Sequence, residues 1–205
     1  MVITEARPIS RGRIGVWVDG EYVGAVEPLV WADSGLTLGQ ETDAQALTTL
    51  LREAAYSQAK RRALNMLSAR SYSTAQLTER IAQKTDRVSA ERAVARMEEL
   101  GYLNDAAYAA RLAERLWEEK GFALRRIRHE LTQQGLSRDD IDDAVSWIDP
   151  DEEPQRAVEL ALARFAGSAD EKACRRAAAW LERSGYGRRA VFYALRALRT
   201  GEAPE

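Results

Sequence analysis

The first forty residues differ from the rest of the chain in that their apolar positions form short runs typical of β-strands. Two runs, Arg13–Val18 and Glu21–Val26, are rich in β-branched and aromatic residues and flank the pair Asp19-Gly20. Because Asp-Gly readily adopts the positive φ angles of a type I′ turn, the pattern predicts a β-hairpin. Two strands alone are marginally stable in water, so we expect a third strand within Val2–Ile9.

Beyond residue 42 the apolar positions recur every three or four residues, which is the period of an amphipathic helix. No proline interrupts this pattern between Pro28, where we expect a helical turn, and Pro150. The expected helix N-caps are Thr42 or Asp43, Ser73 or Thr74, Ser89, and Asn104 or Asp105, and Gly101 is expected just past a helix end.

The helical pattern repeats along the chain. Apolar pairs recur at intervals of 50 residues, at Leu77 and Ile81, Ile127 and Leu131, and Ala177 and Leu181. We therefore predict a mainly α fold of three tandem three-helix repeats in an elongated array, with a small N-terminal β-hairpin element. The expected divisions are the hairpin element with a lead-in helix at 1–54, repeats at 55–103, 104–149 and 150–199, and a tail at 200–205.

Two further features bear on how the repeats join. The stretch Asp149–Pro154 contains two prolines and four carboxylates, so we expect it to be extended, poorly buried and able to bend, whereas Gly101–Asp105 should be stiff. Four aromatic residues near predicted helix ends are interpreted as side chains that fill the gaps between helices, with base stacking as the alternative: Tyr72, Tyr102, Phe122 and Tyr186. Three tryptophans are interpreted as core or inter-repeat packing: Trp117, Trp147 and Trp180.

Of the 205 residues, 45% are hydrophobic and 30% are charged. No apolar run in the sequence approaches the roughly 20 residues that a membrane-spanning helix needs. The first residues lack the features of an export signal, so we expect a cytoplasmic protein that does not associate with membranes. Cys174 and His129 are the single cysteine and histidine, which argues against a disulfide, a zinc site or a Cys/His nucleophile. Nucleotide-binding, hydrolase and metalloprotease motifs are absent. We therefore expect no catalytic residue, no metal and no cofactor.

Charge is segregated along the chain despite a formal net charge of −2. The stretch from Asp139 to Glu153 is acidic, and we interpret its carboxylates as a solvated helix start rather than a magnesium site. The stretch from Glu171 to Arg199 is net positive. Arginines outnumber lysines by 26 to 4, which is explained either by the codon composition of the source genome or by the bidentate contacts that Arg makes with anions.

The placement of the arginines favours the second explanation, because several occupy equivalent positions in different repeats. If the repeats stack regularly, they would form a ridge that suits a polymeric acidic partner. The candidate partner-binding residues are Arg70, Arg80, Arg125, Arg126, Arg128, Arg175, Arg176, Arg183, Arg188 and Arg189.

Three motifs in a fixed order resemble the RecX regulators of bacterial recombination. They are Leu-Gly-Tyr-Leu-Asn-Asp-Ala-Ala-Tyr-Ala at 100–109, Arg125-Arg126-Ile127 followed by Glu130-Leu131 and Gly135-Leu136, and Leu181 followed by Gly185-Tyr186. The resemblance extends from about Val16 to Leu198. One departure is Ser184, where the family more often has a basic residue, which puts one contact in doubt.

The resemblance implies a non-enzymatic modulator of the RecA recombinase that acts in DNA repair and the SOS response. Proteins of this kind bind the RecA filament on DNA, lie in its groove, and inhibit its ATPase, strand exchange and growth. We expect a monomer whose contact with DNA is weak or indirect. The alternative is a helical DNA-binding protein that acts without a recombinase and contacts phosphates through Arg183, Arg188 and Arg189.

Overall fold

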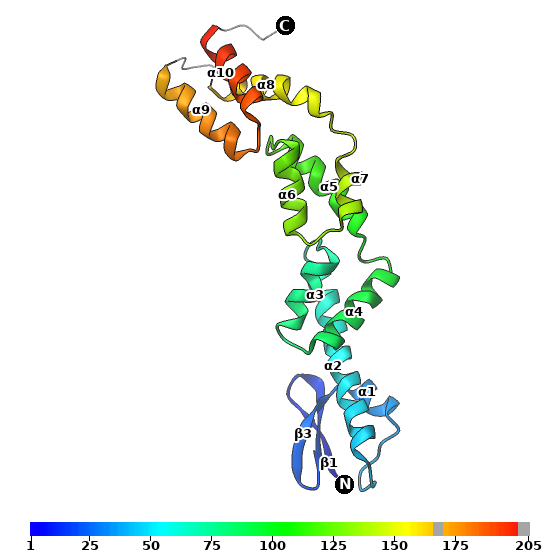
Figure 1. Ribbon diagram of the computed structural model, residues 1–205. Helices are drawn as coiled ribbons and strands as arrows, with labels where there is room; N and C mark the ends of the chain where they lie inside the picture. The colour runs from blue at the N-terminus through cyan, green and yellow to red at the C-terminus, as the bar shows by residue number, and fades with distance from the viewer. Residues whose placement is uncertain (166–169, 201–205) are drawn as a thin grey trace. The chain divides into compact units, whose positions relative to one another are not determined.

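The computed structural model describes residues 1–165 and 170–200, so the predicted tail beyond Thr200 lies outside the described residues. It consists mainly of helices with one small antiparallel sheet, which confirms the predicted fold class (Figure 1). The elements are β1 (Ile3–Ile9), the 3₁₀ turn η1 (Ser10–Gly12), β2 (Arg13–Val18), β3 (Glu21–Val26), α1 (Pro28–Asp33), α2 (Ala44–Leu67), α3 (Thr74–Ala82), α4 (Arg87–Glu99), α5 (Asp105–Glu118), α6 (Leu124–Gln133), α7 (Arg138–Val145), η2 (Pro150–Glu152), α8 (Glu153–Phe165), α9 (Glu171–Arg183) and α10 (Arg188–Thr200). The chain divides into two compact units, residues 1–103 and 104–205, which we call the N-terminal and C-terminal units.

The predicted hairpin and its third strand are confirmed in the N-terminal unit. The strands pair in the order β1-β2-β3, and the β2–β3 turn has positive φ angles of 50° at Asp19 and 84° at Gly20. One face of the sheet buries Ile3, Val16 and Val26 together with residues of α2. The helix therefore covers the apolar face that a small sheet cannot bury alone.

Helix α2 has 24 residues and contributes to two cores. Leu50 and Ala54 pack on the sheet, whereas Ala59 and Ala63 pack against α3 and α4 in a second cluster. The predicted division after residue 54 falls inside this continuous helix. The sheet element and the first helical bundle thus share one helix.

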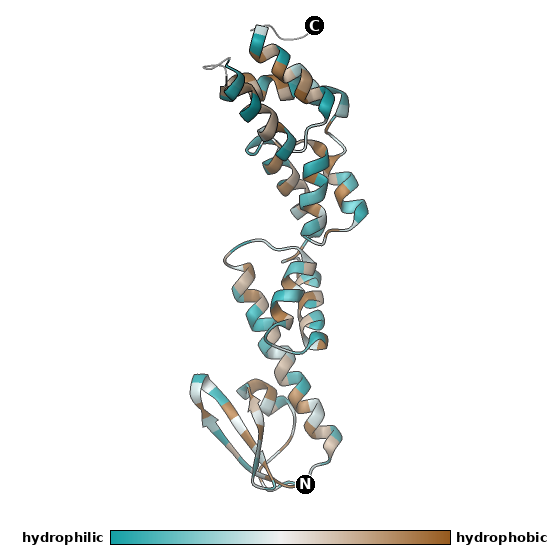
Figure 2. Ribbon diagram, turned by 60° about the vertical axis from the view of Figure 1, so that its left-hand side comes forward, coloured by the Kyte–Doolittle hydropathy of each residue, from teal (hydrophilic) through white to brown (hydrophobic). Residues whose placement is uncertain are grey.

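Three bundles of three helices follow, α2–α4, α5–α7 and α8–α10, and each has its own core of buried apolar residues. The apolar pairs that recur every 50 residues lie on α3, α6 and α9 and are fully buried in all three bundles. Apolar and polar residues alternate around these helices, as the hydropathy colouring in Figure 2 shows. The predicted three-helix repeat is confirmed.

Side-chain caps begin α2, α3 and α5 at residues where the sequence predicts them. The side chains of Asp43, Ser73 and Asn104 accept hydrogen bonds from backbone N–H groups in the first turns of α2, α3 and α5. The prediction that Ser89 caps α4 is wrong: Asp86 is the cap, and its Oδ1 accepts from the N–H of Ser89 at 2.9 Å. Asp86 lies one turn earlier than Ser89 and accepts the hydrogen bond of the first turn, so the helix begins there. Ser89 is therefore inside the helix and buried.

The prediction that Asp149–Pro154 is extended is also wrong, whereas the poor burial predicted for it is confirmed, because none of its six residues is buried. Residues Pro150–Glu152 form η2, and α8 begins directly at Glu153 with Pro154 in its first turn. Proline fits there because the first N–H groups of a helix have no partner within the helix. The Glu153 carboxylate accepts a hydrogen bond from the N–H of Leu124 at 2.7 Å, so the segment is fastened to the second bundle.

Aromatic residues divide between buried plugs and exposed rings. Tyr72 and Tyr186 are buried as expected, but Tyr102 is 59% exposed and Trp147 is 51% exposed. Tyr102 follows Gly101, whose φ of 76° turns the chain away from the core at the end of α4. Trp147 follows the end of α7 and lies on the outside of Trp117, with ring centroids 5.8 Å apart.

Candidate partner-binding surface

The start of α6 is positioned by the turn between α9 and α10. The N–H of Ala123 donates to the carbonyl of Ser184 at 2.9 Å, which joins the second and third bundles through their backbones. Gly185 follows with a φ of 98°, and a Cβ atom there would lie 2.6 Å from the Cβ of Arg126. The first turn of α6 therefore lies directly against the α9–α10 turn.

Polar side chains strengthen the same junction from α8. The guanidinium of Arg156 lies 4.0 Å from the ring centroid of Trp117, and its Nη2 donates to the carbonyl of Trp117 at 2.7 Å. Tyr186 is buried close to Arg156 and Glu153, and burial raises the pKa of its phenol to about 12. The junction thus combines hydrogen bonds, a cation–π contact and a neutral buried phenol.

Three of the ten candidate arginines have carboxylate partners in the C-terminal unit. Arg126 pairs with Glu130 at 2.5 Å and Arg175 pairs with Glu171 at 2.6 Å, both four residues apart on one helix. Arg128 pairs with Asp142, and this hydrogen bond holds the pKa of the Asp142 carboxyl below its usual value. These pairs are partly exposed to solvent and individually weak, but they lower the positive charge that each arginine presents.

Three other candidates lie over aromatic rings. In the N-terminal unit Arg70 and Arg80 lie 3.9 and 5.9 Å from the ring centroid of Tyr72. In the C-terminal unit Arg189 lies 5.7 Å from the ring of Tyr193. A cation–π contact orients a guanidinium without using its N–H donors, so these arginines keep hydrogen-bonding capacity.

The remaining candidates, Arg125, Arg176, Arg183 and Arg188, are exposed and have no ion-pair partner among the described residues. The docking of α6 on the α9–α10 turn brings the segments of Arg125, Arg183 and Arg188 side by side, and we call these three residues the junction patch. Arg175, which is equivalent to Arg125 by repeat, lies about two turns before Arg183, near the start of α9. The three arginines of the junction patch therefore belong to segments that meet where the second and third bundles join.

Sequence reasoning missed the acidic partners of these arginines. The spacings of Arg126 to Glu130 and of Glu171 to Arg175 are four residues, so both pairs were readable as neighbours on a helix face. The partner of Arg128, Asp142, comes from the next helix, and no local signal in the sequence indicates that pair.

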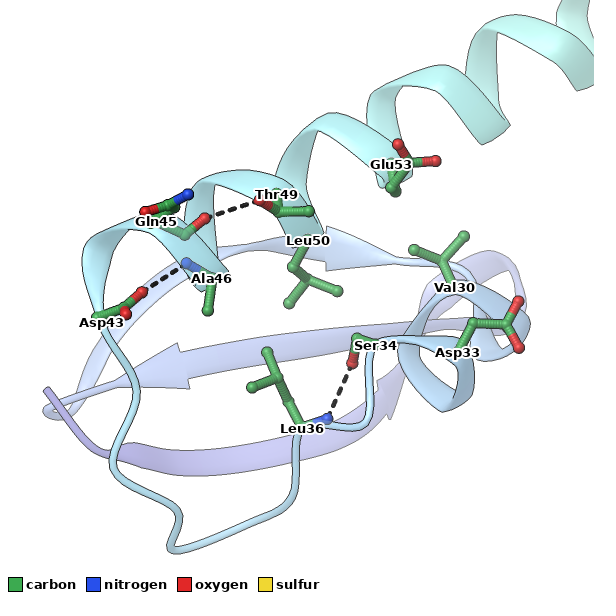
Figure 3. A pocket seen from close by; sticks show the side chains of 10 residues that line it. All are labelled: Val30, Asp33, Ser34, Leu36, Asp43, Gln45, Ala46, Thr49, Leu50 and Glu53. Carbon is green, nitrogen blue, oxygen red and sulfur yellow. Dashed lines mark hydrogen bonds between the residues drawn. The ribbon is translucent and has the colours of Figure 1, made fainter.

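A cavity of about 530 Å³ lies between α1, the following loop and the start of α2 in the N-terminal unit (Figure 3). Leu36 and Leu50 point toward each other across it, and Asp33, Asp43 and Glu53 lie at its edge. Asp43 caps α2 and Glu53 pairs with Arg92 at 2.5 Å. Two of the three carboxylates thus have structural partners, and the described lining of this cavity includes none of the candidate arginines.

Potential metal ligands are scattered over residues 1–165 and 170–200. Within these ranges no group of three or more His, Cys, Asp or Glu residues is arranged to hold a metal ion. The helices of the described segments are too short or too polar to cross a bilayer. Cys174 is buried in the third bundle, and His129 is exposed.

Comparison with known proteins agrees with this architecture. Residues 104–145 match the family model described as RecX, second three-helix domain. A regulatory protein RecX from Trichlorobacter lovleyi is 35% identical over 130 residues, which cover 60% of this chain and 84% of the relative. A regulatory protein RecX from Clostridioides difficile is 28% identical over 166 residues, which cover 80% of this chain and 78% of the relative.

Solved structures show the same fold. A crystal structure of regulatory protein RecX aligns with a TM-score of 0.64 at 22% identity and covers 95% of this chain and 98% of the other. The RecX structure from Lactobacillus salivarius aligns with a TM-score of 0.56 at 16% identity, over 70% of this chain and 96% of the other. From the 35% identity over most of a relative's length, together with the match to the second three-helix domain, the chain belongs to the RecX family of regulatory proteins.

Proposed function

We propose that this protein binds the RecA–DNA filament and inhibits its ATP hydrolysis and strand exchange, without catalysing a reaction itself. It acts as a monomer in the cytoplasm. Membership of the RecX family supports a regulatory role, and the observation that carries the proposed mode of binding is the junction patch of exposed arginines with no described acidic partner.

The mode of binding follows from the separate bundles. A helical filament presents the same acidic groups on each protomer, and a chain with several weakly binding surfaces gains affinity when they engage successive protomers. Guanidinium groups suit this task because they bind carboxylates and phosphates in a bidentate manner. Local ion pairs, such as Arg128 with Asp142, limit the net charge and hence indiscriminate attraction to DNA.

The test is a triple charge reversal of the junction patch, Arg125→Glu, Arg183→Glu and Arg188→Glu. We expect the variant to lose at least about tenfold in apparent affinity for the filament, because repulsion replaces several charge-assisted contacts. The measurements are inhibition of the DNA-dependent ATPase of RecA and co-sedimentation with preformed filaments, with circular dichroism to verify the helix content.

The matched control reverses three exposed basic residues on the same unit, Arg111→Glu, Arg115→Glu and Lys120→Glu, and should retain inhibition. Full inhibition by the junction variant would refute the assignment of this surface. Strong binding to bare DNA with no added affinity for the filament would instead support the alternative of a DNA-binding protein that acts without a recombinase.

A further inference from the structure

A groove in the N-terminal unit gathers four arginines from segments that are far apart in the sequence. Arg11 comes from the turn between β1 and β2, Arg13 is the first residue of β2, and Arg61 and Arg62 come from α2. The groove has a volume of about 410 Å³, and the amides of Gln58 and Asn65 complete its polar lining. Among the described residues, no carboxylate and no aromatic ring belongs to the lining.

The positive charge of this groove is only partly balanced within the described residues. Arg61 lies 2.9 Å from a carboxylate oxygen of Glu27, which is outside the groove lining. Arg11 and Arg62 are exposed, and no ion pair with either is found in the described part of the chain. Like charges gathered in one groove repel each other, so an anion bound among them would relieve the repulsion.

A buried donor in the same groove lacks an acceptor. The Nε atom of Arg13 is inaccessible to solvent and has no hydrogen-bond partner within residues 1–165 and 170–200. Buried polar atoms in folded proteins are nearly always hydrogen-bonded, and one that is not suggests a missing ligand or ion. Arg11, two residues earlier, has a φ of 61°, an uncommon backbone conformation for a residue other than glycine.

We propose that this groove binds phosphate groups of a nucleic-acid backbone. Guanidinium groups bind phosphate in a bidentate manner, and amide side chains such as those of Gln58 and Asn65 commonly donate to phosphate oxygens. Four arginines carry more positive charge than is required to neutralise a single carboxylate. They suit a polymer whose negative charges are closely spaced, such as a nucleic-acid backbone. Because the described lining has no aromatic ring, the groove holds the backbone and does not read base sequence.

This site is separate from the junction patch, since its residues all belong to the N-terminal unit. It does not depend on the proposed inhibition of a recombinase. It also differs from the DNA-binding alternative considered above, which uses arginines of the third bundle. Binding of DNA and binding of a protein partner are thereby assigned to different parts of the chain.

The test uses the full chain and a fluorescent single-stranded oligonucleotide without secondary structure, followed by anisotropy over a series of salt concentrations. The variant Arg11→Glu with Arg62→Glu should bind at least about tenfold more weakly at low salt, because two attractive interactions with phosphates become repulsive. The negative slope of log affinity against log salt should become shallower by about 1.4, roughly 0.7 for each single-strand phosphate that is no longer neutralised.

The matched control, Arg52→Glu with Lys84→Glu, changes the net charge by the same amount on exposed positions of the same unit outside the groove. It should bind within about threefold of the parent chain, as distant surface charges are screened. An equal loss of affinity in both variants, or no loss in the groove variant, overturns the proposal. Displacement of the oligonucleotide by poly-glutamate at equal charge concentration would also overturn it, because the groove would then bind carboxylates as well as phosphates.

Discussion

Gly185 shows how one residue determines whether two bundles can join. It adopts a φ of 98°, and a Cβ atom at this position would lie 2.6 Å from the Cβ and 3.0 Å from the backbone N of Arg126. Every residue other than glycine would therefore meet both backbone strain and a steric clash. The close approach of the α9–α10 turn to the first turn of α6 therefore requires glycine at this position.

We predict that Gly185→Ala lowers the free energy of unfolding of the C-terminal unit by about 2–4 kcal/mol, from the unfavourable φ and overpacking together. Thermal or urea denaturation followed by circular dichroism measures the change. Gly187→Ala serves as the control, because no atom of the described residues lies within 4 Å of a Cβ there and its φ is not positive. Equal losses in the two variants would contradict the proposed close approach.

At the scale of single elements, helix caps link local sequence to stability and to pH. Asp86 begins α4, and the hydrogen bond from the backbone N–H of Ser89 lowers the pKa of its carboxyl below the ordinary value of 3.8. A carboxyl with a lowered folded-state pKa stabilises the fold above its unfolded-state pKa. That stabilisation is lost as the pH falls through the folded-state pKa.

We predict that Asp86→Ala lowers the free energy of unfolding by about 1 kcal/mol at neutral pH, the usual cost of removing a cap. The difference from the parent chain should shrink as the pH falls below about 4. Urea denaturation at a series of pH values measures it. Asp86→Asn keeps the acceptor without the titrating group, so it should retain most of the stability and show no such pH dependence. A difference that stays constant down to about pH 2, below the ordinary range of a carboxyl, would argue against this role.

At the scale of the molecule, the buried cores lie within the two compact units. The sheet core and the first bundle core are formed by residues up to Leu103, and the other two cores by residues from Ala109 onward. The second and third bundles are further joined by the contacts of Ser184, Glu153 and Arg156. We infer that the C-terminal unit is an independent folding unit.

We predict that residues 104–205 expressed alone keep their helix content and unfold cooperatively, because a domain of about 100 residues buries enough apolar surface to be stable. Circular dichroism during thermal unfolding checks this. The fragment 104–149 is the comparison, since it lacks the third bundle and therefore the junction contacts, and it should melt at a clearly lower temperature. A fragment 104–205 without a cooperative transition would show that it depends on the N-terminal unit.

The sequence by itself determined the features that depend on local spacing. The sequence predicted the Asp19-Gly20 turn, the repeated buried pairs, and the caps of α2 and α3 to within one of two neighbouring residues, because backbone geometry within a few residues decides them. The incorrect prediction that Ser89 caps α4 also has a local cause, because Asp86, the residue that forms the cap, lies only three positions earlier.

Only the tertiary structure decided which distant residues meet. Glu153 accepts a hydrogen bond from Leu124, and Arg128 pairs with Asp142. Arg11 and Arg13, at the junction of η1 and β2, line a groove together with residues of α2, which lies far along the chain. Spacing along the chain carries no signal for such contacts, because they depend on how amphipathic faces pack after the helices have formed. For the same reason the sequence identified the arginines of this protein but not which of them would be paired, and which would be left to bind a partner.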